Sequence, residues 1–125
     1  MWLITPTGFY SIVEKPTDRG KGTLTVRARV RGDLLALRRA FCPSLGRVRE
    51  SEDTDYRYRA AAKRTELAGA LARMIEDLSY SNFKSEVAIQ QGLDRAHLYH
   101  DVWDVLRRLQ DDPVFAASRP AAGYA

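Results

Sequence analysis

Apolar and polar residues alternate along two segments of the chain, and this alternation predicts two β-strands. The apolar side of the first segment, residues 22–31, consists of Leu24, Val26, Ala28 and Val30. The second segment, residues 55–64, has on its apolar side Tyr56, Tyr58, Ala60 and Ala62. A period of two places one side of a strand against a core and leaves the other side free. Threonine, arginine and lysine occupy most of the free positions.

Three further strands are predicted with less regular patterns. Residues 1–5 and 9–15 are rich in β-branched and aromatic side chains,. Pro6-Thr7-Gly8 lies between them and has the composition of a turn, so the two strands should form a hairpin,. Residues 16–22 then form a loop, and a short strand over residues 47–52 pairs with the strand over 55–64. Trp2, in the first of these strands, is expected to lie in the core.

Apolar residues recur at helical spacing in the remaining segments. Asp33 is expected to be the N-cap of a helix over residues 34–41, which Pro43 follows,. Thr65 should cap a longer helix. The apolar stripe of that helix consists of Leu67, Ala70, Leu71, Met74 and Leu78.

Two helices are predicted after that point. The first is short, covers residues 82–91 and ends at Gly92,. Asp94 caps the second, which ends before Pro113 and places Trp103 at the edge of its apolar stripe. The residues expected to face the core from this last helix are Leu98, Tyr99, Val102, Val105, Leu106 and Leu109.

The order of these elements, β-β-β-α-β-β-α-α-α, predicts an α+β fold. The short connections between strands favour an antiparallel sheet of four to five strands with three to four helices packed on one face. A chain of 125 residues has the usual size of one domain,. We expect residues 1–110 to form this single domain and the Ala/Pro-rich residues 111–125 to form a flexible tail.

The net charge of +4 is distributed unevenly along the chain. Residues 1–49 contain ten Lys/Arg and three Asp/Glu, and residues 50–64 contain four of each. Residues 65–125 contain six Lys/Arg and nine Asp/Glu. The basic excess therefore belongs to the first half of the chain, and an anionic partner is the class of ligand that it favours,.

The basic residues should gather on one surface if both alternating strands turn their apolar sides toward the helices. This predicted basic sheet face consists of Arg27, Arg29, Arg31, Arg57, Arg59, Lys63 and Tyr10. Arginines beside an aromatic ring suit phosphate contacts and base stacking. The same surface suits an acidic protein or a nucleoprotein that the chain inhibits, and a solvated face without a ligand is the competing interpretation. The sequence thus predicts a small, non-enzymatic binding module.

An alternative function is a small hydrolytic or metal-dependent enzyme centred on the last helix. Its candidate residues are His97, His100 and Asp101, since a His–Asp pair can act as a general base or bind a metal ion. The histidines are three residues apart, unlike the four-residue spacing of the helical zinc motif,. A polar helix face explains the same residues, so the prediction includes no resident metal and no cofactor.

Other features bear on location and assembly. Cys42 is the only cysteine, which excludes an internal disulfide and favours a buried, inert thiol,. No segment approaches the roughly 20 apolar residues that span a bilayer, and the first residues lack the pattern of a signal peptide. These features predict a cytoplasmic protein. A sheet edge without cover predicts a homodimer.

Several segments are similar to a family of short bacterial proteins of unknown function. They are Met1-Trp2-Leu3, Phe9-Tyr10-Ser11-Ile12-Val13, Leu24-Thr25-Val26-Arg27-Ala28-Arg29, Asp55-Tyr56-Arg57-Tyr58-Arg59-Ala60, Tyr80-Ser81-Asn82-Phe83-Lys84 and Tyr99-His100-Asp101-Val102-Trp103. The resemblance covers residues 1–110. It implies a bacterial source and carries no activity, cofactor, partner or functional residue over to this chain.

Overall fold

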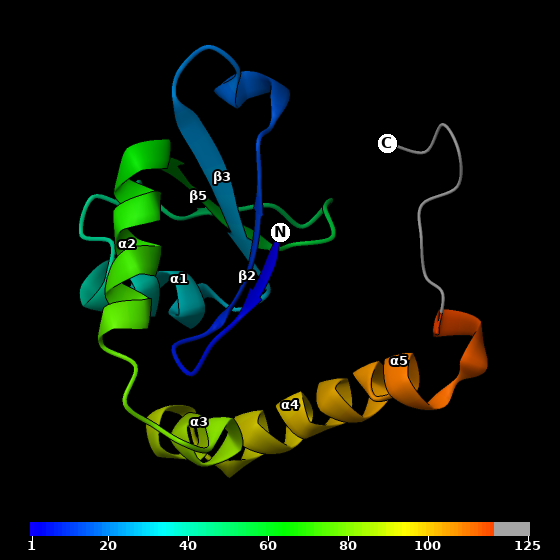
Figure 1. Ribbon diagram of the computed structural model, residues 1–125. Helices are drawn as coiled ribbons and strands as arrows, with labels where there is room; N and C mark the ends of the chain where they lie inside the picture. The colour runs from blue at the N-terminus through cyan, green and yellow to red at the C-terminus, as the bar shows by residue number, and fades with distance from the viewer. Residues whose placement is uncertain (117–125) are drawn as a thin grey trace. The chain divides into compact units, whose positions relative to one another are not determined.

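A computed structural model describes residues 1–116, which divide into two compact units. The first unit, residues 1–83, holds the β-sheet and two α-helices, and the second begins at Lys84 and is helical. Figure 1 shows both units along the chain. Within residues 1–116, no helix combines the length and the apolar character that crossing a membrane requires.

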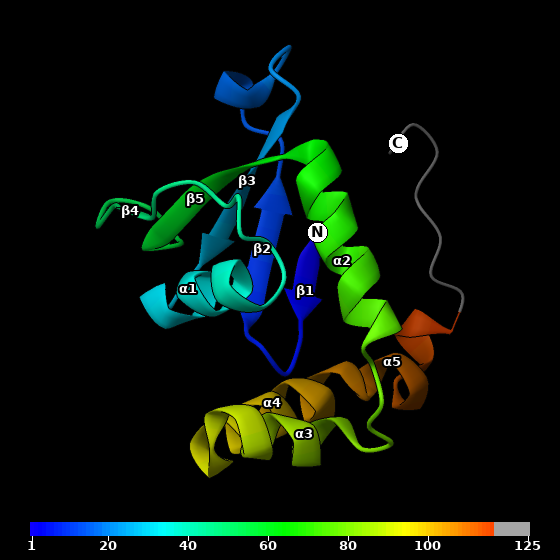
Figure 2. The ribbon, with the colours of Figure 1, turned by 90° about the vertical axis from the view of Figure 1, so that its left-hand side faces the viewer.

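The first unit is built on a five-stranded antiparallel sheet with the order β1-β2-β3-β5-β4 (Figure 2). Its strands are β1 (Trp2–Ile4), β2 (Phe9–Val13), β3 (Thr23–Ala28), β4 (Arg49–Glu50) and β5 (Tyr58–Lys63). The register places Val26 opposite both Ile12 and Ala60, so the apolar positions of three strands share one face. The predicted α+β class and the antiparallel sheet are confirmed.

Two helices, α1 (Arg31–Ala40) and α2 (Arg64–Glu76), pack against the same face of the sheet (Figure 2). The core between them and the sheet includes Tyr10, Val26, Leu34, Leu37, Ala60 and Leu67. Leu34 and Leu37 lie one helical turn apart, which is why α1 presents a continuous apolar stripe to the strands. The side chains that alternate with the core residues point to the other face of the sheet.

The start of α1 differs from the prediction. Asp33 was expected to cap this helix, but the helix begins at Arg31 and its N-cap is Val30. The carboxylate of Asp33 instead accepts a 3.0 Å hydrogen bond from the backbone N–H of Phe9. The Asp33 carbonyl accepts a 2.7 Å bond from the hydroxyl of Tyr10, which is fully buried. A contact with a strand distant in sequence therefore replaces the local cap.

The loop between β2 and β3 is organised by the buried carboxylate of Asp18. It contains a 3₁₀ turn, η1 (Pro16–Asp18), in the segment predicted as a loop. Asp18 accepts hydrogen bonds from the backbone N–H of Lys15 at 2.8 Å and from the hydroxyls of Thr23 and Thr25, both at 2.7 Å. Burial raises the pKa of the Asp18 carboxyl, but these hydrogen bonds outweigh burial and hold the pKa below its ordinary value,.

The second unit consists of helices joined by short connections. They are α3 (Phe83–Gln91, whose first residue belongs to the first unit), α4 (Leu93–Leu106), α5 (Arg108–Asp111) and the 3₁₀ turn η2 (Pro113–Phe115). Gly92 lies between α3 and α4 with a φ of 92°, a left-handed conformation that favours glycine,. Gly92 is also the N-cap of α4, so the assignment of that cap to Asp94 is wrong. The expected tail includes the last residue of α5, Asp111, and all of η2, and its last residues, 117–125, lie outside the described residues.

The apolar stripe of α4 and α5 does not face a core as predicted. Leu98, Val105, Leu106 and Leu109 are 57%, 60%, 53% and 55% exposed, whereas Tyr99 is buried. Helical spacing shows which residues share a face, but it does not show whether another element covers that face. The single domain expected over residues 1–110 stays a prediction.

Candidate functional site

Three aromatic side chains form a row on the sheet face opposite α1 and α2. Trp2 of β1 meets Phe9 of β2 edge to face, with ring centroids 5.5 Å apart. Phe9 in turn contacts Tyr56, with centroids 6.3 Å apart. Trp2 is 69% exposed, whereas Tyr56 is buried. This aromatic row of Trp2, Phe9 and Tyr56 thus presents an open indole at one end.

The Tyr56 ring lies against two arginines: Arg27, which belongs to β3, and Arg29, which follows the last residue of that strand. The guanidinium carbon of Arg27 is 4.6 Å from the ring centroid, and that of Arg29 is 4.5 Å from it. Both distances are within the range of a cation–π interaction. Arg29 Nη1 also donates a 2.8 Å hydrogen bond to the carbonyl of Asp55. The residues before β5 therefore fold back over the arginine side of the sheet.

The position of Tyr56 corrects the sequence analysis, which placed this ring on the core side together with Tyr58. The strand β5 begins only at Tyr58, and residues 52–57 form turns and bends. The alternation of a strand cannot be extended into a turn, because turn residues do not point to alternate sides. Tyr56 is therefore buried on the opposite face from Tyr58.

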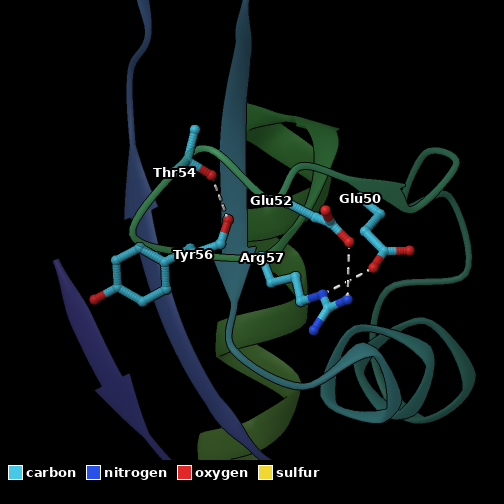
Figure 3. A network of polar contacts seen from close by, with 5 residues as sticks. All are labelled: Glu50, Glu52, Thr54, Tyr56 and Arg57. Carbon is cyan, nitrogen blue, oxygen red and sulfur yellow. Dashed lines mark hydrogen bonds and ion pairs between the residues drawn. The ribbon is translucent and has the colours of Figure 1, made fainter.

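Arg57 is held in the β4–β5 loop by two carboxylates. Its Nε lies 2.8 Å from Oε1 of Glu50, and its Nη2 lies 3.3 Å from Oε1 of Glu52 (Figure 3). The hydrogen bond with Glu50 raises the pKa of the Arg57 guanidinium. Figure 3 shows the Tyr56 ring turned away from this ion pair, and the Thr54 hydroxyl donates to the Tyr56 carbonyl at 2.8 Å. Arg57 is thus neutralised locally.

Arg59 and Arg27 are directly opposite each other in the β3–β5 register. Arg59 Nη2 donates to the Thr54 hydroxyl at 2.6 Å and to the Tyr56 carbonyl at 3.2 Å. Arg27 Nη2 donates to the Ser11 hydroxyl at 2.6 Å. Within residues 1–116, the Nε atoms of both arginines are buried and have no hydrogen-bond partner. Two cations therefore share this part of the sheet without a neighbouring carboxylate on their Nε atoms.

The structure brings together only part of the predicted basic sheet face. Arg27, Arg29 and Arg59 surround Tyr56, and Lys63 is exposed at the end of β5. Arg31 is exposed but belongs to α1, because β3 ends at Ala28.

The prediction that Tyr10 belongs to the binding face is wrong. Its ring is fully buried in the core, so it cannot serve as a surface stacking group. The parity of β2 explains this, because Phe9 and Tyr10 point to opposite faces and Tyr10 faces the helices. The prediction that Trp2 lies in the core is also wrong, since this side chain is exposed. The alternation within each strand could have identified Phe9 and Trp2 only if the buried face had been known.

Arg49 was not among the predicted site residues. This residue is exposed on β4 and pairs with Arg59 in the register, so it extends the line of arginines across the sheet. Its position in the predicted strand over residues 47–52 is the feature of the sequence that could have identified it.

The alternative site on the last helix has a different arrangement from the one expected. His100 Nδ1 lies 3.0 Å from the Nζ of Lys84, and the His100 ring stacks on Trp103 with centroids 5.4 Å apart. His97 and Asp101 are exposed and make no side-chain hydrogen bond or ion pair within the described part of the chain. No group of three or more His, Cys, Asp or Glu residues suited to a metal ion occurs among residues 1–116.

Comparisons of this chain with protein-family models, with curated proteins and with solved structures find no match. The resemblance to a family of short bacterial proteins therefore stays a prediction.

Proposed function

We propose that this protein binds single-stranded nucleic acid through the sheet face that carries the aromatic row. The observation that carries the proposal is the exposed indole of Trp2 in contact with Phe9, followed by Tyr56 between two arginines. Every base has a flat face that stacks on an aromatic ring, so the exposed ring of Trp2 can accept a base of any sequence, while Phe9 and Tyr56 support it from behind,.

The charges around the row support an anionic strand as the ligand. Arg29 and Arg49 are exposed on this side of the sheet, and both can contact phosphates,. An acidic protein would also use these charges, but it would not require an exposed indole at the end of a row of aromatic rings. The combination of aromatic and cationic groups therefore favours a nucleic acid over an acidic protein.

Direct binding tests the proposal. We expect a labelled oligothymidylate or oligouridylate to bind the protein in fluorescence anisotropy, with an affinity that falls steeply as salt increases. Trp2→Ala should weaken binding roughly 5- to 150-fold, since stacking contributes about 1–3 kcal/mol per base. In a Trp103→Phe variant, Trp2 is the single remaining tryptophan, and its fluorescence should be quenched by the bound strand.

Charge-matched variants separate the sheet face from general electrostatics. Arg29→Ala should weaken binding and reduce the salt slope by about one. Arg39→Ala removes the same charge from the end of α1 and should leave both unchanged. An absence of binding at low salt, or equal affinity of Trp2→Ala and the wild type, contradicts the proposal. Binding to polyglutamate that survives Trp2→Ala would indicate an acidic protein partner instead.

A further inference from the structure

We propose that the exposed apolar stripe of α4 and α5 binds the same stripe of a second copy of this chain, with the two helices antiparallel. The stripe consists of Leu98, Val102, Val105 and Leu109. Three of these side chains are more than half exposed, and Val102 is half-buried. The surface is distinct from the sheet face of the proposed function and from the sheet edges.

The spacing of the stripe is that of a two-helix coiled coil. The steps from Leu98 to Leu109 are four, three and four residues, which matches the alternation of d and a positions in a heptad,. The break between α4 and α5 does not interrupt the stripe. Arg107 has helical angles, φ −57° and ψ −25°, and its N–H donates to the Trp103 carbonyl at 2.9 Å.

The charges beside the stripe identify the partner as a second copy. Asp101 and Arg108 are seven residues apart and occupy the same flanking position of two successive heptads. In an antiparallel pair, this position of one helix faces the equivalent position of the other. Asp101 of each copy then meets Arg108 of the other, which forms two ion pairs around one twofold axis.

The two charged groups are free to make these pairs. Asp101 and Arg108 are exposed, and neither side chain has a hydrogen bond or ion pair within residues 1–116. The neighbouring Arg107, by contrast, is 3.0 Å from Asp111 of its own helix and lies on the side away from the stripe. A parallel pair would instead bring Asp101 near the apolar Leu106, so it would lose the charge complementarity.

Sedimentation of the full chain over a concentration series tests self-association. We expect a reversible monomer–dimer equilibrium at concentrations below about 1 mM. Asp101→Arg and Arg108→Asp should each weaken it roughly tenfold, because two attractive pairs become two repulsive ones. Combining both substitutions in one chain should restore the wild-type equilibrium. Asp104→Arg, the matched control, changes the charge of α4 outside the pairing positions and should have little effect.

A mixture of the two single variants provides the sharpest result. The Asp101→Arg chain carries two arginines at the pairing positions and the Arg108→Asp chain carries two aspartates, so they should form a heterodimer tighter than either homodimer. Leu98→Ser with Val105→Ser should abolish association, and circular dichroism would verify that the helix remains folded. A wild-type monomer at about 1 mM, or a double charge exchange that fails to restore association, overturns the proposal.

Discussion

Arg27 of β3 lies directly opposite Arg59 of β5, and the Nε of each is buried without a hydrogen-bond partner within residues 1–116. Like charges opposite each other in a strand pair reduce stability. A buried donor without a partner lowers the free energy of unfolding by a further amount of about 1–3 kcal/mol. Local features that oppose stability are concentrated at functional sites, and this pair lies beside the aromatic row.

Replacing Arg27 by methionine separates stability from binding. Arg27→Met keeps most of the apolar stem and removes both the like-charge contact and the unpaired Nε. It also removes the contact with Tyr56 and the hydrogen bond to Ser11. We expect these effects to offset, so that the free energy of unfolding in urea stays within about 1 kcal/mol of the wild type. The affinity for an oligonucleotide should fall. A large loss of stability with unchanged affinity would make Arg27 a structural residue.

The second prediction concerns the Tyr56 ring. Tyr56→Ala removes a buried ring that contacts Phe9, Arg27 and Arg29. We expect the free energy of unfolding to fall by about 2–4 kcal/mol, the range for removal of a buried aromatic side chain with partial relaxation. Tyr56→Phe is the matched control, because no hydrogen bond of this hydroxyl occurs among the described residues. It should stay within about 0.5 kcal/mol of the wild type. Equal losses in both variants would mean that the hydroxyl, and not the contacts of the ring, supplies the stability.

The third prediction concerns the acid sensitivity of the β2–β3 loop. The folded-state pKa of Asp18 lies below the ordinary value of 3.8. The ionised carboxyl therefore contributes its full stabilisation above that value, and the contribution is lost as the pH falls through the lower folded-state pKa. Asp18→Asn should lower the free energy of unfolding at neutral pH by about 1–3 kcal/mol, since it weakens hydrogen bonds to a charged group.

The pH dependence of unfolding provides the check on Asp18. The difference between Asp18→Asn and the wild type should shrink as the pH falls below 3.8. Asp53→Asn, which changes an exposed carboxylate in the β4–β5 loop, should be close to neutral,. A difference for Asp18→Asn that stays constant between neutral and acid pH would mean that ionisation of Asp18 does not contribute.

The fourth prediction concerns the close approach of Gly8 to helix α1. A Cβ atom at Gly8 would lie 2.7 Å from the Tyr10 hydroxyl and 2.8 Å from Cβ and Cγ of Asp33. Gly8→Ala must therefore displace the hydrogen bond between the Tyr10 hydroxyl and the Asp33 carbonyl. We expect a loss of about 1–3 kcal/mol in the free energy of unfolding, the usual cost of breaking a buried hydrogen bond.

Gly32→Ala is the matched control for Gly8. Gly32 lies in α1, and a Cβ there would meet only Val30 at 3.9 Å. This substitution should be neutral or raise stability by up to about 1 kcal/mol, because alanine favours a helix. Thermal or urea unfolding of both variants would decide the matter, and equal stabilities would contradict the close packing around Gly8.

Most of the sheet could be predicted from local patterns. The alternation in β3 and β5 identifies each as a strand, and the turn composition of residues 6–8 identifies the first hairpin. These patterns depend only on the geometry of neighbouring residues, which the sequence contains. The antiparallel character of the sheet followed from the short connections between strands, for the same reason.

The candidate site depended on contacts that local patterns do not contain. Phe9 and Tyr10 were both apolar, and only packing against α1 decided that Tyr10 entered the core and Phe9 the aromatic row. Tyr56 joined that row because β5 begins three residues later than the predicted segment 55–64.

Within the bounds of each strand and helix, the sequence by itself determined which residues share a side or a face, since period and turn composition are local properties. The tertiary structure decided which of these faces became buried, because burial depends on a partner element that is distant in the chain. The stripe from Leu98 to Leu109 has the spacing of a core-facing helix, yet three of its four side chains are exposed. Tyr10 and Asp33, 23 residues apart, were joined only when β2 packed beneath α1.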